Sequence, residues 1–483
     1  MEKRVFKNFI YNLLLKFFMS AAPLITSPYL ARILHPEGIG VFSYTSTIAA
    51  AFALFAGLGT ATYGQREIAY RQDNLSLRSK TFFEIFLLRV LTTLPVLAAY
   101  LWISFVYTEY SKYLLILSIM VFSGILDISW YYLGMEDFGK IVIRDVFVKL
   151  AQIACIFLLV KTESDLWIFV AINAVSTLLS YMLYFVKIRN YLDFSAWREV
   201  ELKSLHPHLI GSLSFFIPAL SVELYSHFDK IMLGVLLEST VENGYYEQAR
   251  KIVAAMIPVL VSLNTVLLSR IANHYAKGEK KEIIFWYRTS FNVILMLVFP
   301  IMLGMWMVSD NFVLWFFGPD FAKVSLLLKI SCPMILFMCV GNFVGVQYLS
   351  PTGQQRKMTY AYASAAVTNF ILNLILIPRL MAVGALLASV CAEVISCGLQ
   401  VYFLKKGEYN FTLFKDAWKY LLATVIMGAV ISAFNYLIPL QGAGLTFADI
   451  GVGMLSYMIV LLLVKEPVLA IAQAYYKKKR AES

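Results

Sequence analysis

Long apolar runs recur along the whole chain, separated by short polar links. A run of about 17–25 apolar residues crosses the hydrocarbon core of a bilayer as one α-helix. Because no water reaches that core, the backbone has to satisfy its own hydrogen bonds, and a helix does so within one segment. The composition, 60% hydrophobic and 15% charged, agrees, since soluble domains carry about 25% charged residues. The sequence therefore predicts an all-α integral membrane protein with about 14 transmembrane helices.

The expected spans lie at about residues 8–30, 39–62, 82–106, 113–133, 141–160, 166–186, 209–235, 250–268, 289–308, 325–348, 358–377, 383–404, 417–437 and 447–464. The amino-terminal run is too long for a signal peptide and lacks a cleavage site, so we interpret it as the first retained span.

The basic residues predict how these spans cross the membrane. The net charge of +11 could indicate nucleic-acid binding, but Lys and Arg gather in the short links and form no basic stripe interleaved with aromatic side chains. With the amino terminus inside, alternate links collect about 29 of the 41 basic residues and the opposite links about 7. We therefore place both termini in the cytoplasm and expect no nucleic-acid partner.

A weak internal repeat suggests the domain organisation. When Gly40 is laid on Gly244, the segment Gly-Val-Phe-Ser-Tyr-Thr-Ser-Thr-Ile-Ala-Ala aligns with Gly-Tyr-Tyr-Glu-Gln-Ala-Arg-Lys-Ile-Val-Ala-Ala, with one insertion. Each segment follows the first span of a six-span half, and an even number of spans makes the halves parallel. We expect a six-helix lobe at 1–190, a second six-helix lobe at 191–408, and two further helices with a basic tail at 409–483, with residues 187–208 linking the lobes.

Catalytic and metal-binding patterns are missing from the sequence. The polar segments reach about twenty residues at most, and the chain has no Walker loop, GxSxG or HExxH motif, so we expect neither an enzyme nor a cofactor. The five cysteines lie in apolar runs without CxxC spacing and are interpreted as small core residues. His206 and His208 form an HxH pair without further ligands nearby, so we interpret them as surface-loop residues and predict no metal site.

Polar residues at membrane depth are the candidates for function, because they are costly there and usually face a cavity or one another. The first span carries a stripe along one helix face, formed by Asn8, Asn12, Lys16, Ser20, Pro23 and Ser27. Lys16 either pairs with Asp127 or Asp229 as structural support or lines a cavity, and we favour the cavity.

The seventh span has a similar polar face. Asp229 and Lys230 point about 100° apart and need not neutralise each other. Any single charge at this depth is more often part of a packed ion pair than a ligand. The cations outnumber the acids, which suggests a cavity of positive potential suited to a phosphate or pyrophosphate. The further candidates are the cations Arg32, Arg89, Lys149, Arg250 and Lys329 and the acids Asp127, Glu223 and Glu393.

Several motifs resemble those of the Wzx-type polysaccharide flippases, within the multidrug/oligosaccharidyl-lipid/polysaccharide exporter (MOP) superfamily. The similar stretches span nearly the whole chain: Ala31-Arg-Ile-Leu-His-Pro-Glu-Gly-Ile-Gly40, Asp127-Ile-Ser-Trp-Tyr-Tyr-Leu-Gly-Met-Glu136, Asp229-Lys-Ile-Met-Leu-Gly234 followed by Gly244-Tyr-Tyr246, Asn369-x3-Asn373, Ile377-Pro378, Gly384-Ala385 and Glu393. Each motif is loose, but their order and spacing carry the resemblance.

The resemblance implies two six-helix lobes around a central cavity and two trailing helices in a bacterial cytoplasmic membrane. It also implies alternating-access transfer of an undecaprenyl-pyrophosphate-linked oligosaccharide to the outer leaflet for surface polysaccharide such as O-antigen or capsule, with a polymerase as partner. Expected substrate-binding residues are Asn12, Lys16, Arg32, Arg89, Lys149, Lys230 and Arg250, and expected coupling-ion residues are Glu223, Asp229 and Glu393. Alternatives are a lipid II flippase or a cation-coupled multidrug antiporter on the same fold; a scaffold or a glycosyltransferase is disfavoured.

Overall fold

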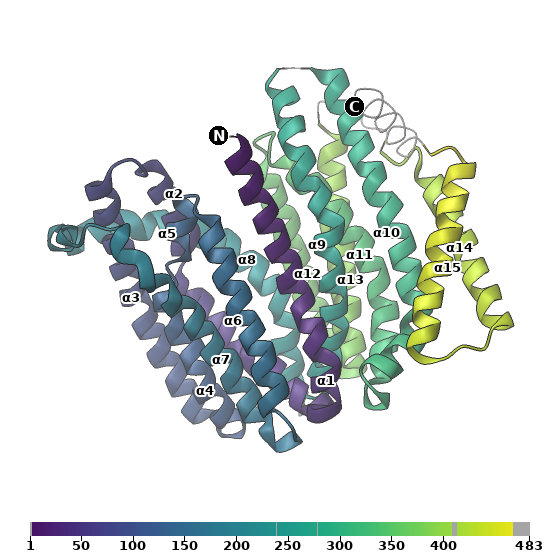
Figure 1. The fold of residues 1–483 in the computed structure, drawn as a ribbon, viewed down its shortest axis with the longest axis horizontal. Helices are drawn as coiled ribbons and strands as arrows, with labels where there is room; N and C mark the ends of the chain where they lie inside the picture. The colour runs from purple at the N-terminus through teal and green to yellow at the C-terminus, as the bar shows by residue number, and fades with distance from the viewer. Residues whose placement is uncertain (1, 238, 278, 408–412, 467–483) are drawn as a thin grey trace. The chain divides into compact units, whose positions relative to one another are not determined.

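The computed structural model describes the backbone of all residues except 1, 238, 278, 408–412 and 467–483. Side chains are described except at those positions and at 2–17, 20, 138–143, 187, 218, 221–226, 258–259 and 261–276. The described chain is helical throughout and contains fifteen α-helices and no strand (Figure 1). The predicted all-α membrane fold is therefore confirmed, because ten of the helical segments described are long and apolar enough to cross a membrane. The expected number of fourteen spans is not confirmed.

The contacts within the chain divide it into two compact units, residues 1–247 and 248–483. The first unit contains α1 (Glu2–Gly57), α2 (Thr60–Tyr70), α3 (Leu75–Val106), α4 (Ser111–Ser123), α5 (Ser129–Gly134), α6 (Phe138–Leu159), α7 (Leu166–Met182), α8 (Leu205–Leu236) and the first turns of α9 (Val241–Ala276). The second unit contains the rest of α9, α10 (Lys280–Phe316), α11 (Lys323–Val344), α12 (Gln355–Leu380), α13 (Ala382–Lys405), α14 (Ala417–Leu437) and α15 (Gly442–Leu463).

Helix α1 contains two membrane crossings joined by a sharp kink. A straight helix of its 56 residues would be about 84 Å long, far more than the thickness of a bilayer core. The chain reverses at His35, whose φ of 55° and ψ of 176° are not helical. Pro36 follows directly and lacks the N–H that a continuing helix would use. The two spans expected at 8–30 and 39–62 are therefore joined without a loop.

The second crossing ends earlier than expected. Helix α1 stops at Gly57, and α2 begins at Thr60 after Gly59, which has a φ of 74°. A left-handed backbone is accessible to glycine at no steric cost, so this position turns the chain sharply. The apolar window expected to run to residue 62 included this turn, because its small residues are nearly neutral in hydropathy.

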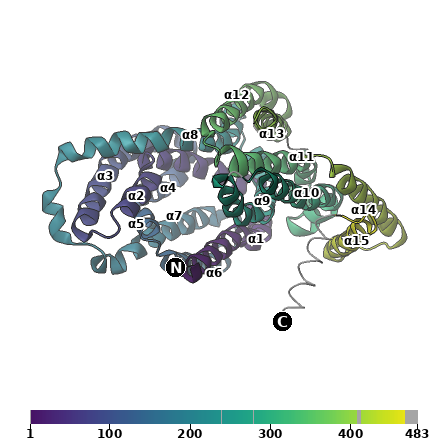
Figure 2. The same ribbon diagram turned by 90° about the horizontal axis from the view of Figure 1, so that it is seen from above.

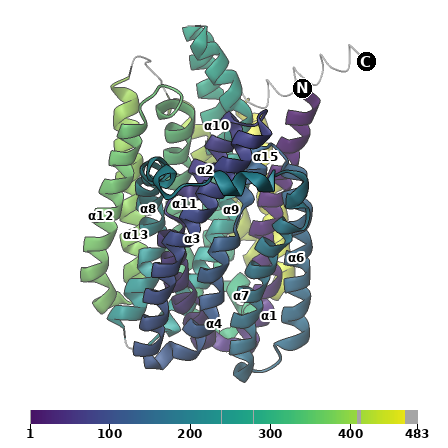
Figure 3. The same ribbon diagram turned by 90° about the vertical axis from the view of Figure 1, so that its left-hand side faces the viewer.

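In the first unit the helices α3, α4, α6 and α7 run side by side (Figure 3). The link from α7 to α8 forms three short 3₁₀ segments, η4 (Leu183–Asn190), η5 (Phe194–Glu199) and η6 (Leu202–Ser204), and follows the edge of this unit (Figure 2). An aromatic cluster fixes the link, since Tyr184 and Leu192 pack with Phe82, Trp130 and Tyr132. The polar link predicted between the repeat halves is thus an ordered part of the first unit.

In the second unit α10 packs against α11, α14 and α15, while α13 packs against α11 and α12. The buried side chains are mostly aliphatic and aromatic, with Phe291, Phe317 and Phe343 among the largest fully buried. Cys332, Cys339 and Cys397 are buried among them as expected for small core residues, while Cys155 is half-buried and Cys391 is exposed.

Candidate functional site

A cluster of polar side chains joins α1, α8 and the start of α9 in the first unit. Glu247 of α9 is its centre: the Nζ atom of Lys230 lies 2.6 Å from Glu247 Oε2, and the Ser43 hydroxyl donates a hydrogen bond of 2.9 Å to the same oxygen. The Lys230 and Glu247 side chains are only 16% and 12% exposed. An ion pair so shielded from water is held by charge-assisted hydrogen bonds rather than by a weak surface contact.

Asp229 has a different partner from its neighbour. The residue is 2% exposed, and its carboxylate accepts a hydrogen bond from the hydroxyl of Tyr246. Asn243 donates a hydrogen bond of 2.7 Å to the backbone carbonyl of Lys230. As the spacing of adjacent helical residues predicted, Asp229 and Lys230 do not neutralise each other. We name Ser43, Asp229, Lys230, Asn243, Tyr246 and Glu247 the hairpin cluster, because three contacts among its α8 and α9 residues tie the α8–α9 hairpin together.

Two glycines bring the backbones of α1 and α9 into contact beside the hairpin cluster. A Cβ atom added at Gly40 would lie 1.8 Å from the carbonyl oxygen of Thr240, and one added at Gly244 would lie 2.0 Å from that of Pro36. Each distance is shorter than any real Cβ contact, so both positions require glycine. Gly40 and Gly244 are the two residues that the internal repeat aligns.

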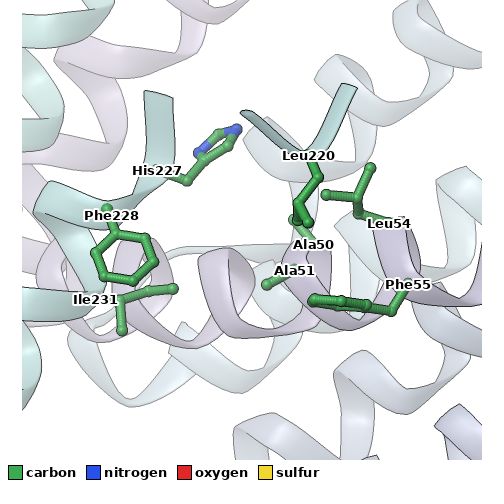
Figure 4. Close-up of a pocket in the computed structure, with 8 residues that line it drawn as sticks. All are labelled: Ala50, Ala51, Leu54, Phe55, Leu220, His227, Phe228 and Ile231. Atoms are coloured by element: carbon green, nitrogen blue, oxygen red, sulfur yellow. The ribbon is translucent and has the colours of Figure 1, made fainter. Parts of the chain in front are cut away.

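A small apolar pocket lies between α1 and α8 (Figure 4). Its walls are Ala50, Ala51, Leu54 and Phe55 from α1 and Leu220, His227, Phe228 and Ile231 from α8. The cavity volume is about 30 Å³, which is room for one or two waters. The pocket is too small for a sugar ring or an isoprenoid unit, so it marks a place where the two helices separate rather than an open substrate path.

The α1–α8 contact is close on both sides of this pocket. Toward one end, a Cβ atom at Gly234 would lie 2.2 Å from the Tyr44 ring. Toward the other, where α1 leads into α2, a Cβ atom at Gly59 would lie 2.5 Å from the carbonyl oxygen of Ser212, and one at Gly211 would lie 2.3 Å from the ring of Tyr63 in α2. Small residues therefore set the helix separation at both ends, as is common for helices that pack within a membrane.

Two predicted substrate residues of the first unit have protein partners. Arg89 donates to Asp127 Oδ2 at 3.2 Å and to the Gly124 carbonyl at 2.6 Å, which is the packed ion pair that a charge at membrane depth most often forms. Lys149 donates to Gln152 at 2.8 Å, and Gln152 donates in turn to Asn173 at 2.8 Å.

The remaining predicted residues are distributed over both units. Arg32 is exposed near the kink of α1. In the second unit Arg250 contacts the Met334 sulfur at 3.1 Å, Glu393 is buried in α13, and Lys329 pairs with Asp310 at 2.5 Å. Of the predicted site residues, the adjacent Asp229 and Lys230 both belong to the hairpin cluster. The side chains of Asn12, Lys16 and Glu223 lie outside those described.

Lys230, a predicted substrate contact, pairs with the Glu247 carboxylate. The sequence interpretation of one group needs correction. His208 was expected on a surface loop, yet it is 7% exposed and its two ring nitrogens contact Tyr63 and Glu84, because α8 begins at Leu205 and carries it into the unit. No group of three or more potential metal ligands occurs among the residues that the structure describes.

Ser43 and Glu247 were missed as candidates, although a signal was present. Each lies three residues after its aligned glycine, so the repeat already makes Ser43 and Glu247 equivalent. In the structure these two residues form a hydrogen bond with each other.

Comparison with known proteins supports this fold and class. The chain is 20% identical over 408 residues to the Escherichia coli K12 protein named "Putative O-antigen transporter". This alignment covers 83% of this chain and 97% of that protein. A solved structure of the lipid II flippase MurJ in an inward closed conformation superimposes with a TM-score of 0.79 at 17% identity, covering 95% of this chain and 99% of that one. A solved inward-facing structure of a multidrug resistance transporter of the MATE family and MOP superfamily superimposes with a TM-score of 0.64 at 13% identity, covering 81% of this chain and 94% of that one.

The fold is that of multi-pass membrane transporters, among them a MATE transporter of the MOP superfamily. Within that class, the model of the family described as "Polysaccharide biosynthesis protein" matches residues 5–273, more than half of the chain. The chain therefore belongs to this family, and the resemblance to polysaccharide flippases that the motifs suggested is confirmed.

Proposed function

We propose that the protein flips an undecaprenyl-pyrophosphate-linked oligosaccharide from the inner to the outer leaflet of a bacterial cytoplasmic membrane, by alternating access, for surface polysaccharide synthesis. Both termini lie in the cytoplasm in this proposal, and a polysaccharide polymerase receives the product. Family membership and the similarity to the Escherichia coli protein support the substrate class.

The Lys230–Glu247 pair is the observation that carries the proposal. A pyrophosphate has the charge and the acceptor oxygens to replace one carboxylate as the partner of an ammonium group. Before the substrate binds, Glu247 holds Lys230 in a defined position, so that no unpaired charge is left at membrane depth. Ser43 supplies a hydroxyl beside the same oxygen that the phosphate would approach.

The substrate route also includes the other predicted cations and amides in this proposal. Lys16 and Asn12 lie on the first crossing of α1, and Arg32, Arg89, Lys149 and Arg250 are the remaining candidate contacts. Glu223, Asp229 and Glu393 are proposed to bind the coupling ion. The lobes at 1–190 and 191–408 would alternate around the cavity, with 409–483 as the trailing helices.

Polymer export in cells that lack the chromosomal copy tests the function. We expect Lys230→Ala, at matched membrane abundance, to lower export at least tenfold, because the loss of one charge-assisted contact weakens binding by about 1.5–3 kcal/mol. Lys329→Ala is the matched control, since Lys329 also pairs with an acid but lies in α11. Normal export by Lys230→Ala would contradict the proposed role. Efflux of cationic dyes from vesicles, without lipid-linked sugar transfer, would favour a multidrug antiporter instead.

A further inference from the structure

A buried histidine joins three helices at the start of α8. The Nδ1 atom of His208 lies 2.8 Å from the Tyr63 hydroxyl of α2, and its Nε2 atom lies 2.9 Å from Glu84 Oε2 of α3. All three residues are at most 7% exposed. Both ring nitrogens are therefore used, and the three residues come from segments far apart in the sequence.

The local packing brings α8 unusually close to this group. Gly211, one turn after His208, leaves the space that the Tyr63 ring occupies, and Gly59 lets the turn before α2 lie against the Ser212 carbonyl. The ring of Tyr63 also meets the His208 ring edge to face at 5.6 Å. The position of His208 is consequently set by backbone contacts as well as by its hydrogen bonds.

The hydrogen-bond roles follow from the chemistry of the partners. An ionised carboxylate only accepts, so Nε2 of His208 carries a hydrogen and donates to Glu84. In the neutral imidazole Nδ1 then accepts from the Tyr63 hydroxyl. An added proton goes to Nδ1, which becomes a donor to the Tyr63 oxygen, while the tyrosine hydrogen rotates away. The imidazolium and Glu84 then form a shielded ion pair.

Charged groups surround this group from each helix that packs against it. From α2, the Arg66 guanidinium lies 5.3 Å from the Tyr63 ring centre and pairs with Glu67, which also binds Arg71. From α3 and η6, Lys80 and Ser204 face Glu84. His206 of α8 is exposed. The Glu67 charge is matched by two arginines, which leaves Glu84 as the acid in direct contact with the imidazole.

We propose that Tyr63, His208 and Glu84 form a proton-binding site that ties the start of α8 to α2 and α3. With the proton bound, the His208–Glu84 ion pair holds α8 in place. When the proton leaves to water, a hydrogen bond from the neutral imidazole to the Glu84 carboxylate replaces the ion pair and the first turns of α8 loosen. Helix α8 begins the expected second repeat half and carries Asp229 and Lys230 of the hairpin cluster. Binding of a proton at its start would therefore affect the helix that supplies these two residues.

Amide hydrogen exchange of the full chain in lipid nanodiscs tests this site without any substrate. Exchange of residues 205–216, corrected for the intrinsic effect of pH, is compared at about pH 5.5 and about pH 8. We expect wild type to exchange at least about fivefold faster at the higher pH, and His208→Gln to lose that difference. His206→Gln, two residues away and exposed, is the control and keeps it.

Glu84→Gln provides a second variant in case His208→Gln does not fold. It keeps a hydrogen-bond acceptor for Nε2 but removes the charge, so no ion pair forms in either protonation state and the acceleration is lost or strongly reduced. A wild type without the acceleration, a His208→Gln variant that retains it, or a Glu84→Gln variant identical to wild type would overturn the proposal. None of these results depends on the transported substrate, so the proposed flippase function would be unaffected.

Discussion

Replacing Gly40 by alanine should push α1 away from the α8–α9 hairpin. The added Cβ atom would lie 1.8 Å from the Thr240 carbonyl oxygen, whereas real Cβ atoms essentially never lie within 3.0 Å of a neighbouring heavy atom. The two backbones must therefore separate by at least 3.0 − 1.8 = 1.2 Å. Since the atom met is backbone, no side-chain rotation relieves the contact.

The magnitude follows from the cost of overpacking. Inserting one methyl group into a closely packed contact costs about 1–3 kcal/mol, which here destabilises only the arrangement in which α1 and the hairpin touch. A free-energy change of that size shifts the balance between closed and open arrangements about 5- to 150-fold. The Ser43–Glu247 hydrogen bond beside the contact should weaken with it.

Cysteine labelling measures this shift directly. Thr240 is 4% exposed, so a cysteine at this position, in a chain whose five natural cysteines are replaced, is protected while the contact is closed. We expect a membrane-impermeant maleimide to react about 5- to 150-fold faster when Gly40→Ala is added. Gly124→Ala is the matched control, because a Cβ atom there meets nothing within 4 Å. Equal labelling rates for the two alanine variants would refute the reasoning.

Three further substitutions probe other features of the structure. His35→Gly should raise thermal stability by about 1 kcal/mol, because φ 55° and ψ 176° belong to a region that glycine alone adopts without strain; unchanged melting would contradict this. Gly59→Ala should lower stability by about 1–3 kcal/mol, since it combines a φ of 74° with a contact at 2.5 Å, and wild-type melting would argue against it. Burial opposes ionisation of Asp416, but the hydrogen bond from Arg288 outweighs it and holds the pKa of Asp416 below its usual range. The Asp416–Arg288 pair stabilises the fold at pH values above the pKa that Asp416 has in the unfolded chain, and this stabilisation is lost as the pH falls through the lowered pKa of the folded state. Asp416→Asn should therefore abolish the part of the acid-induced fall in melting temperature that comes from this pair.

The helical architecture could be predicted because it depends on local hydropathy alone. Apolar windows located nearly every long helix, and adjacent positions in α8 correctly separated Asp229 from Lys230. Side-chain pairing over long distances could not be predicted in the same way. His208 lies 124 residues from Glu84, and a polar link in the sequence does not reveal that η6 ends at Ser204 and a buried helix starts one residue later.

Glu247 shows a different limit of sequence reasoning. It lies between the seventh and eighth expected spans and was therefore treated as part of a polar link. In the structure α9 begins at Val241, so Glu247 is already two turns inside a helix and shielded from water. Windows of mean hydropathy miss such residues because an acid, an arginine and a lysine near a helix start lower the average below the value expected for a span.

The internal repeat explains why these residues meet. If a two-fold axis relates two parallel halves, equivalent residues are separated by twice their distance from that axis, so they touch only when both lie within a few ångströms of it. Gly40 approaches the amide nitrogen of Gly244, and Ser43 hydrogen-bonds to Glu247, three residues further along each aligned segment. Two successive equivalent pairs in contact, one turn apart, place the proposed axis along this seam. At the Ser43–Glu247 pair the two residues have to differ, because two glutamates in contact would repel and two serines could not hold Lys230. The pairing of Ser43 with Glu247 is therefore where the two halves are expected to have diverged, and Ser43→Glu should separate α1 from the hairpin even more strongly than Gly40→Ala in the same labelling assay.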